Sequence, residues 1–260
     1  MIEGEDMNYI TYSLYNKKTI NNWLLVGAFE KTIEFEPMTM SGDINSWLSK
    51  GFSIHENPCR KEFVDKRRKS IPDMPCVQKN VLGENIVEQN QVKTWELYFP
   101  WENPNVELSH FWFTPTYLKS YALSYIECEE EHMGDFDLVT CGGATIWINN
   151  ELIIDFTPYT RNLPKETTFN TRLKKGLNKI LVCFDDLAER DTQYYFRIDY
   201  KSDKDILVKV PVGEKNSYDI KQVEDALSHG YFSRDTVIGG DIYVNIINPF
   251  EHSLNCKINT

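Results

Sequence analysis

The sequence lacks the features of a membrane protein and of a nucleic-acid-binding protein. No apolar run approaches the roughly 20 residues that a membrane-spanning helix needs. The 260 residues carry a net charge of −11, and such an excess of acidic groups repels phosphate backbones. Residues 1–18 contain no basic start followed by an apolar stretch, so they predict no secretory signal peptide. We therefore expect a cytoplasmic protein that binds neither a membrane nor a nucleic acid.

The cysteines lack a metal-binding pattern. None of the six cysteines belongs to a C-x-x-C pair, which is the spacing typical of zinc sites. Cys128, Cys183 and Cys256 lie inside apolar, strand-like patterns. We expect them to be buried free thiols, and a disulfide in a protein exported by another route is the alternative.

The chain also lacks the short motifs of common enzymes. It contains no G-x-S-x-G, H-E-x-x-H, P-loop or G-x-G-x-x-G sequence. Acidic runs are plentiful, for example Glu127–Glu131 with its neighbours and Asp185-Asp186. A glycosidase needs two carboxyl groups about 5–9.5 Å apart, and sequence spacing does not establish that geometry. We interpret the acidic runs as solvated loops and predict no catalytic residue.

A β-hairpin is the clearest local pattern that is present. Gly142-Gly143 precede a run of β-branched and aromatic residues at 144–148. Asn149-Asn150 follow, and asparagine tolerates the positive φ that a two-residue hairpin turn requires. Residues 151–156 then return as the partner strand.

A period of two, rather than 3.6, runs through residues 95–200. Strand-like segments recur at intervals of about ten residues with Gly, Pro and Asn between them, which predicts an all-β, antiparallel β-sandwich. The apolar run 180–184 predicts a central strand that is covered on both faces, and Gly176 is expected to adopt a backbone conformation that other residues resist. The expected strands are 23–29, 95–99, 106–113, 117–128, 136–139, 144–148, 151–156, 167–173, 178–184 and 194–200.

The pattern changes after a polar hinge at 201–205. We expect a strand at 206–212 and a helix at 219–229, with Asp219 as its N-cap. Further strands are expected at 241–247 and 254–258. Because the sequence stops directly after a strand, we expect a fragment, or a short relative, of a longer protein. The predicted parts are a lead-in at 1–22, a β-sandwich at 23–200, and a β-rich extension or start of a second domain at 205–260.

Residues 51–94 have the least regular pattern. They contain a local basic cluster, Arg60–Lys69, in an otherwise acidic protein. Such a run is usually a solvated loop or helix face, and we interpret it in that way. A patch that binds a phosphate or a partner is the alternative.

Three segments share the features of one family. Trp23–Phe29 is similar to a W-x-x-x-G-P-F opening, with Ala28 in place of proline. Ala144–Ile153 resembles a v-x-v-W-x-N-G-x-x-v hairpin, with Asn150 in place of glycine, and Leu173–Val182 resembles an L-x-x-G-x-N-x-L-x-v segment. In this order they resemble the galactose-binding-like jelly-roll domains in the N-terminal region of multidomain bacterial glycoside hydrolases.

The resemblance implies a non-catalytic accessory module, structural or weakly sugar-binding, of a larger bacterial carbohydrate-active hydrolase. The partners it implies are a carbohydrate and a catalytic domain or partner subunit outside this chain. A stand-alone lectin-like protein is the alternative, and a glycoside hydrolase with an acidic pair not identifiable from sequence is third. Relatives often carry a structural calcium, for which Asp135 and Asp137 are candidate ligands. Their spacing matches no recognisable calcium loop, so we expect no metal and no cofactor.

Sugar binding requires an exposed aromatic platform with Asn, Asp or Arg side chains beside it. The densest aromatic group lies between residues 95 and 112, and Trp101 is favoured because it lies in a turn between two prolines. The alternative is that the tryptophans fill the core or a domain interface. The predicted carbohydrate-binding residues are Trp95, Tyr98, Trp101, Asn103, Trp112 and Arg161.

Overall fold

The computed structural model describes residues 7–32, 64, 68, 82–100, 102–213, 217–233, 243–251 and 253. The chain forms two compact units. The larger unit comprises Thr11–Pro211, and the smaller unit comprises Met1–Ile10 together with Val212–Thr260.

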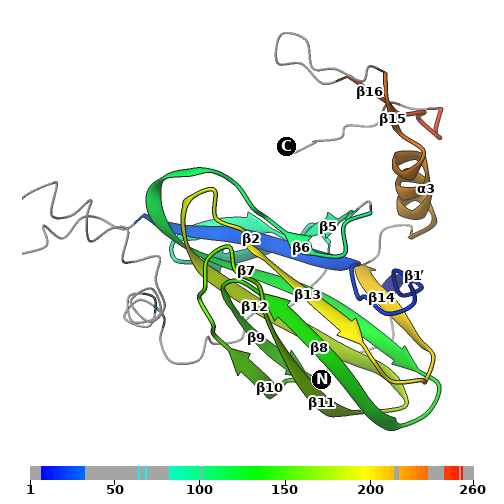
Figure 1. Cartoon of the computed structure of the whole chain (residues 1–260). Coiled ribbons are helices and arrows are strands. Elements are labelled where there is room, and N and C mark those ends of the chain that lie inside the picture. The colour runs from blue at the N-terminus through cyan, green and yellow to red at the C-terminus, as the bar shows by residue number, and fades with distance from the viewer. Residues whose placement is uncertain are drawn as a thin grey trace, which may run out of the picture. The chain divides into compact units, whose positions relative to one another are not determined.

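Most of the described chain belongs to two β-sheets (Figure 1). Among the described residues, sheet A has eight strands and sheet B has four. Sheet A contains β1 (Asn8–Tyr12), β2 (Trp23–Thr32), β5 (Glu96–Tyr98), β7 (Trp112–Cys128), β9 (Gly143–Ile148), β10 (Glu151–Phe156), β12 (Gly176–Arg190) and β14 (Ile206–Gly213). Sheet B contains β6 (Val106–Glu107), β8 (His132–Thr140), β11 (Lys165–Leu173) and β13 (Tyr195–Tyr200).

The strand order follows the pairing of neighbouring strands. Sheet A runs β1-β14-β7-β12-β9-β10, with β2 beside both β7 and β5, and sheet B runs β11-β8-β13-β6. The pairs β2 with β5 and β7, β7 with β12 and β14, β9 with β10 and β12, and β8 with β11 and β13 are antiparallel, as is β13 with β6. The predicted all-β, antiparallel sandwich is confirmed.

Aromatic rings hold the two sheets together. The Trp23 ring contacts the Phe196 ring of sheet B edge-on, with 5.3 Å between the ring centroids. The Phe184 ring of sheet A also contacts Phe196, with 5.0 Å between the centroids. All three side chains are fully buried or nearly so. Residues 180–184 of β12 are buried at every position, which confirms the predicted central strand. Because alternate side chains of a strand point to opposite faces, sheet A is covered on its outer face as well.

Two of the motifs found in the sequence contact each other. The β9–β10 hairpin turns at Asn149 and Asn150, with φ of 52° and 67°, as predicted. Asn149 Nδ2 donates to Asn178 Oδ1 at 2.9 Å, and the Lys179 amide donates to Asn149 Oδ1 at 3.1 Å. Asn178 is fully buried and also bridges both backbone groups of Lys174. These hydrogen bonds of the side-chain amides explain why asparagine occupies both motifs, since each side chain satisfies buried polar groups.

Some of the observed strands differ from the predicted strands. The expected strand 106–113 is two pieces, because β6 ends at Glu107 and residues 108–111 leave the sheet before β7. A hairpin of β3 (Asn85–Glu88) and β4 (Gln91–Thr94) lies within residues 51–94, where no strand was expected. The expected strand 254–258 lies outside the described residues.

The smaller unit contains one helix in its described part, α3 (Ser217–Ser228), which was predicted at 219–229. β15 (Tyr231–Phe232) and β16 (Val244–Asn245) follow α3 in the sequence and pair with each other antiparallel. None of the helices in the described residues is long and apolar enough to cross a membrane.

Candidate functional site

The structure does not bring the described members of the predicted carbohydrate-binding set together at one open site. Trp95 is fully buried and Trp112 is 8% exposed, so neither ring presents an open face. Trp101 lies outside the described residues. Tyr98 and Asn103 both contact Glu107: the Glu107 amide donates to the Tyr98 hydroxyl at 3.1 Å, and Asn103 Nδ2 donates to Glu107 Oε2 at 2.9 Å.

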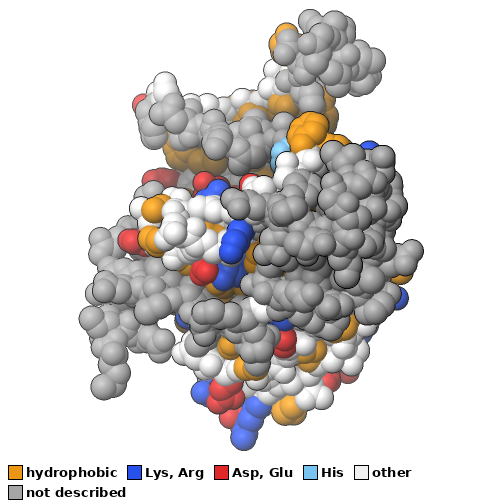
Figure 2. Space-filling model, turned by 90° about the vertical axis from the view of Figure 1, so that its left-hand side faces the viewer, with side chains coloured by type: hydrophobic (Ala, Val, Ile, Leu, Met, Phe, Trp, Pro, Cys, Tyr) orange, Lys and Arg blue, Asp and Glu red, His pale blue; other side chains and the backbone are white. Residues whose placement is uncertain are grey.

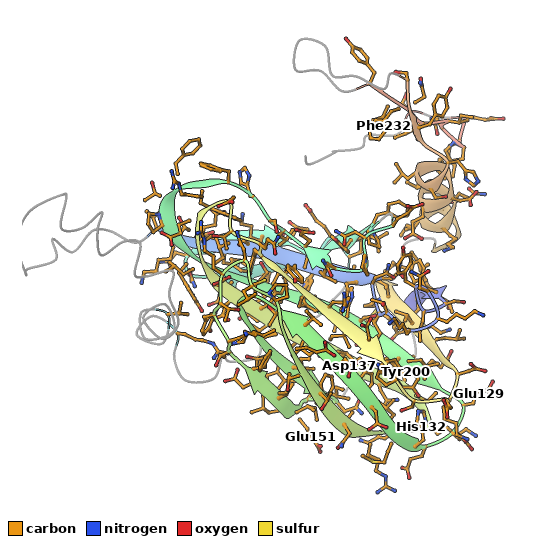
Figure 3. All side chains as sticks on the ribbon, in the orientation of Figure 1. Glu129, His132, Asp137, Glu151, Tyr200 and Phe232 are labelled. Atoms are coloured by element: carbon orange, nitrogen blue, oxygen red, sulfur yellow. The ribbon has the colours of Figure 1, made fainter. Side chains whose placement is uncertain are left out.

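Arg161 lies at another place, in a set of loops at one end of the sandwich. We call this surface the loop end and define it as the exposed and half-buried residues of 108–114, 157–164 and 189–193. In Figure 1 the connection from β6 to β7 and the turn from β12 to β13 lie together at this end. Figure 3 labels Glu129 and His132 at the opposite end.

Hydrogen bonds join the three loops into one surface. Arg161 Nη2 pairs with Asp191 Oδ1 at 3.0 Å and donates to the Glu189 carbonyl at 3.3 Å. Asn162 Nδ2 donates to the Asp191 carbonyl at 3.0 Å. The Tyr194 amide, at the start of β13, donates to Ser109 Oγ at 2.9 Å. The loop end is therefore fixed by contacts within the larger unit.

An exposed aromatic pair belongs to this surface. Phe111 is 46% exposed and Phe113 is 94% exposed. Their ring centroids are 4.9 Å apart with an interplanar angle of 66°. Trp112 between them points to the other side, since it is buried and contacts the His110 ring. Burying a phenylalanine stabilises a protein by about 1.5–3 kcal/mol, so an exposed pair is a feature that packing does not explain.

Charged groups also belong to the loop end, where Arg161 pairs with Asp191. Arg190 is the register partner of Trp112, so its side chain leaves the sheet on the same face as Trp112. It is exposed and makes no ion pair with another described residue. Figure 2 is turned toward this end of the molecule, and hydrophobic, basic and acidic side chains share the described part of that surface. Binding sites for small polar molecules combine aromatic rings with a few polar groups in this way. Phe111 and Phe113 could not be picked out from the sequence, because the strand expected at 106–113 gives no indication of which face is open.

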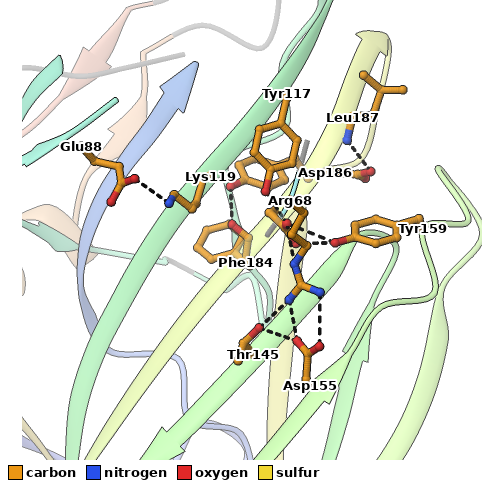
Figure 4. Close-up of polar contacts among 12 residues, drawn as sticks. Arg68, Glu88, Tyr117, Lys119, Thr145, Asp155, Tyr159, Phe184, Asp186 and Leu187 are labelled. Atoms are coloured by element: carbon orange, nitrogen blue, oxygen red, sulfur yellow. Dashed lines mark hydrogen bonds and ion pairs between the residues drawn. The ribbon is translucent and has the colours of Figure 1, made fainter. Parts of the chain in front are cut away.

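A second cluster of polar side chains is buried on the outer face of sheet A (Figure 4). The Arg68 guanidinium forms a two-pronged ion pair with Asp155, in which Nη1 donates to Oδ2 at 3.2 Å and Nη2 donates to Oδ1. Nη2 also donates to Thr145 Oγ1 at 2.7 Å. Arg68 Nε lies 3.1 Å from Asp185 Oδ2, and the two side chains are only 5% and 1% exposed.

Two tyrosines complete the cluster, which we call the Arg68 cradle: Tyr117, Thr145, Asp155, Tyr159 and Asp185. The Tyr117 hydroxyl donates to Asp185 Oδ2 at 2.6 Å, and the Tyr159 hydroxyl lies 3.0 Å from Oδ1. Burial, followed by the charge of Asp185, raises the pKa of both tyrosines. Burial also raises the pKa of Asp185, against the opposing effects of Arg68 and the two hydroxyls.

The guanidinium itself stays charged. Burial opposes its charge, but Asp185 and the hydrogen bond to Asp155 outweigh that effect and raise the pKa of Arg68. The tyrosines therefore remain protonated donors around a carboxylate that a cation balances.

The cradle corrects two sequence-based interpretations. The basic cluster Arg60–Lys69 was expected to be solvated, which is wrong for Arg68. The acidic run Asp185-Asp186 was expected to be a solvated loop. Both residues are instead buried in β12, which lies between β7 and β9 in sheet A. The physical reason is that the positive and negative groups lie over 100 positions apart in the sequence, so their pairing depends on the tertiary fold.

The absence of a side chain at Gly143 makes space for Asp185 and Tyr159 of the cradle. A Cβ added there would lie 2.3 Å from Asp185 Oδ1 and 2.7 Å from the Tyr159 hydroxyl. We expect Gly143→Ala to lower the free energy of unfolding by about 1–3 kcal/mol and to couple to Arg68→Ala by about 0.5–3 kcal/mol in a double-mutant cycle measured by urea denaturation. Gly176→Ala is the control, because its φ of 86° makes alanine unfavourable while nothing lies within 4 Å. Additive losses for Gly143→Ala and Arg68→Ala would contradict the assignment.

The described cysteines are Cys128, Cys141 and Cys183, and all three are buried thiols outside any disulfide. This confirms the prediction for Cys128 and Cys183, whereas Cys256 lies outside the described residues. Burial raises the pKa of the Cys128 thiol to about 11. Within the part of the chain that the structure describes, no three His, Cys, Asp or Glu side chains come together as metal ligands.

Comparisons with known proteins give only partial similarity. No family model matches the chain, and no curated protein matches it. A β-glucosidase from Kluyveromyces marxianus, solved in complex with glucose, is 20% identical over 44% of this chain, with a TM-score of 0.33. The match spans 15% of the length of that enzyme.

Two smaller structures also match. A family 35 carbohydrate-binding module from Clostridium thermocellum is 13% identical over 42% of this chain and 94% of its own, with a TM-score of 0.23. An anti-sigma factor domain-containing protein is 20% identical over 56% of this chain and 50% of its own, with a TM-score of 0.34. With all three TM-scores below 0.5, the fold class rests on the strand pairing described above.

Proposed function

We propose that this chain is a galactose-binding-like jelly-roll module of a larger carbohydrate-active protein, and that it contacts glycans at the loop end. The observation that carries the proposal is the exposed Phe111–Phe113 pair on loops that hydrogen bonds hold in place. A ring face packs against the C–H groups of a sugar, and neighbouring polar side chains bind its hydroxyl groups. Arg161, Asn162 and Asp191 supply such polar groups on the same loop end.

The role is proposed to be non-catalytic. A glycosidase uses a pair of carboxyl groups that reach the substrate. Asp155 and Asp185 both pair with the Arg68 guanidinium inside the protein. They are therefore committed to an internal contact, and they do not offer an acid and a base to a sugar.

A module of a larger protein is favoured over a stand-alone lectin by the smaller unit. Large apolar side chains are exposed there, including Tyr231 at 62%, Phe232 at 66% and Ile247 at 80%. Phe232 is labelled in Figure 3. Exposed apolar groups that lie close together are typical of surfaces that pack against another polypeptide. A catalytic domain or partner subunit is the proposed partner.

The test is a binding screen followed by substitution of the two rings. Affinity electrophoresis against a panel of polysaccharides identifies a ligand, and calorimetry with its oligosaccharides measures the dissociation constant. We expect Phe111→Ala and Phe113→Ala each to weaken binding about 3–10-fold, which corresponds to the contribution of one aromatic contact. Because both rings are exposed, neither substitution is expected to change stability.

Met133→Ala is the matched control. Met133 is 54% exposed on β8 at the opposite end of the sandwich, so its removal is expected to leave binding unchanged. Binding that survives the double substitution of Phe111 and Phe113 would refute the site. Failure of every glycan to bind would refute sugar binding and leave a structural module.

A further inference from the structure

We propose that the Arg68 cradle is a guanidinium-binding site that Arg68 occupies within the same chain, and that a free guanidinium ion fills it when this side chain is removed. The inference is independent of the glycan site. It concerns the buried outer face of sheet A, whereas the proposed glycan contacts lie on exposed loops.

The first support is the match between the site and a planar, forked cation. Asp155 accepts from both terminal nitrogens of Arg68, Thr145 Oγ1 accepts a further bond from Nη2, and Asp185 faces Nε. A guanidinium presents five N–H groups in one plane and binds carboxylates in a two-pronged way. An ammonium ion lacks this fork, so the geometry selects guanidinium over other cations of equal charge.

The second support is that the cradle is held in shape without Arg68. Thr145 Oγ1 donates to Asp155 Oδ1 at 2.7 Å, and the hydroxyls of Tyr117 and Tyr159 bind Asp185. None of these bonds involves the guanidinium. Tyr117, Thr145, Asp155 and Asp185 stand on β7, β9, β10 and β12 of one continuous sheet. The site is therefore preorganised by the sheet, and preorganised groups bind without a large ordering cost.

The third support is charge. Two carboxylates face one cation, and Asp185 is almost completely buried. Without the guanidinium, a buried carboxylate has no cation against it, which is strongly unfavourable. The vacant cradle would therefore take up a cation of suitable shape from solution.

Walls of apolar side chains limit what can enter. Val64, Tyr117, Tyr159 and Leu187 form one buried cluster around the cradle. Arg68 and Val64 are four residues apart, and the Arg68 amide donates to the Val64 carbonyl at 2.8 Å. The occupied cradle thus ties Arg68, and Val64 to which it is hydrogen-bonded, to β10 and β12. Removal of the side chain beyond Cβ leaves space for a group of the size of guanidinium or methylguanidinium.

The experiment is chemical rescue of Arg68→Ala, followed by thermal unfolding. Guanidinium chloride is titrated from 0 to millimolar concentrations, far below denaturing levels, with sodium chloride added to keep the ionic strength constant. We expect a saturable rise of about 5 °C or more in the unfolding midpoint of the variant, because a ligand that binds only the folded state stabilises it. Methylguanidinium should act in the same way. Ammonium should give a smaller effect, and the wild-type protein should show none.

A second variant keeps the test decisive. Arg68→Ala/Asp155→Asn lacks one of the two carboxylate oxygens of the fork, and we expect it to lose the guanidinium response. If Arg68→Ala does not fold alone, it is refolded with and without guanidinium, and the expected result is a folded yield that depends on the ion. A response equal to that of ammonium, a response retained in the double variant, or no response in either format would overturn the proposal.

Discussion

Arg68→Ala is expected to lower the free energy of unfolding by about 3–5 kcal/mol, because it removes one member of a buried ion pair. The substitution leaves Asp185, which is 1% exposed, without the cation that faces it. It also removes two hydrogen bonds to Asp155 and one to Thr145. Tyr117 and Tyr159 still donate to Asp185, which limits the loss but does not balance its charge.

Thermal and urea denaturation measure this effect, and a fall of about 6–20 °C in the thermal midpoint corresponds to the expected loss. Arg172→Ala is the matched control. Arg172 also pairs with a carboxylate, Glu131, but its side chain is 71% exposed, and exposed pairs contribute at most about 1 kcal/mol. Equal effects of the two substitutions would show that the Arg68 cradle is not a buried ion-pair network.

Trp23→Ala is expected to have an effect of similar size, about 3–5 kcal/mol, for a different reason. Trp23 is fully buried between the sheets, contacts the Phe196 ring edge-on, and donates from Nε1 to the Ile20 carbonyl at 2.8 Å. Alanine leaves a large cavity there and an unsatisfied carbonyl group. Both costs act on the contact between sheet A and sheet B.

The measurement is again the denaturant midpoint, with two comparison variants. Trp23→Phe keeps most of the ring volume and loses the hydrogen bond, so it should cost clearly less than alanine. Phe113→Ala removes an aromatic ring that is 94% exposed, and it should leave the midpoint within about 0.5 kcal/mol of the wild type. A neutral Trp23→Ala would place the core elsewhere.

Local patterns in the sequence predicted local structure well. The Asn149-Asn150 turn was predictable because a two-residue hairpin needs positive φ at both positions, and asparagine tolerates it. Gly176 has a φ of 86°, as its place in a turn indicated. The alternation in β7 indicated a strand, and the apolar run in β12 indicated a strand that is buried on both faces. These features depend on near neighbours, which a sequence displays directly.

The functional surfaces were harder to predict. A strand pattern shows that Phe111 and Trp112 point in opposite directions, but not which of them faces water. The pairing of Tyr194 with Ser109 and of Arg190 with Trp112 decides this, and both contacts join segments more than 70 residues apart. The tryptophans were chosen as candidates by residue type, and the structure buries two of them while leaving two phenylalanines open.

The sequence by itself therefore determined the class of fold, the main hairpin and the buried central strand, because periodicity and turn chemistry are properties of short segments. Only the tertiary structure decided that Arg68 lies in a buried acidic cradle and that the loop end exposes an aromatic pair. Both results depend on residues that are far apart in the sequence and close together in the fold. Whether a charge or an aromatic ring is buried therefore depends on the tertiary structure and not on its sequence neighbours.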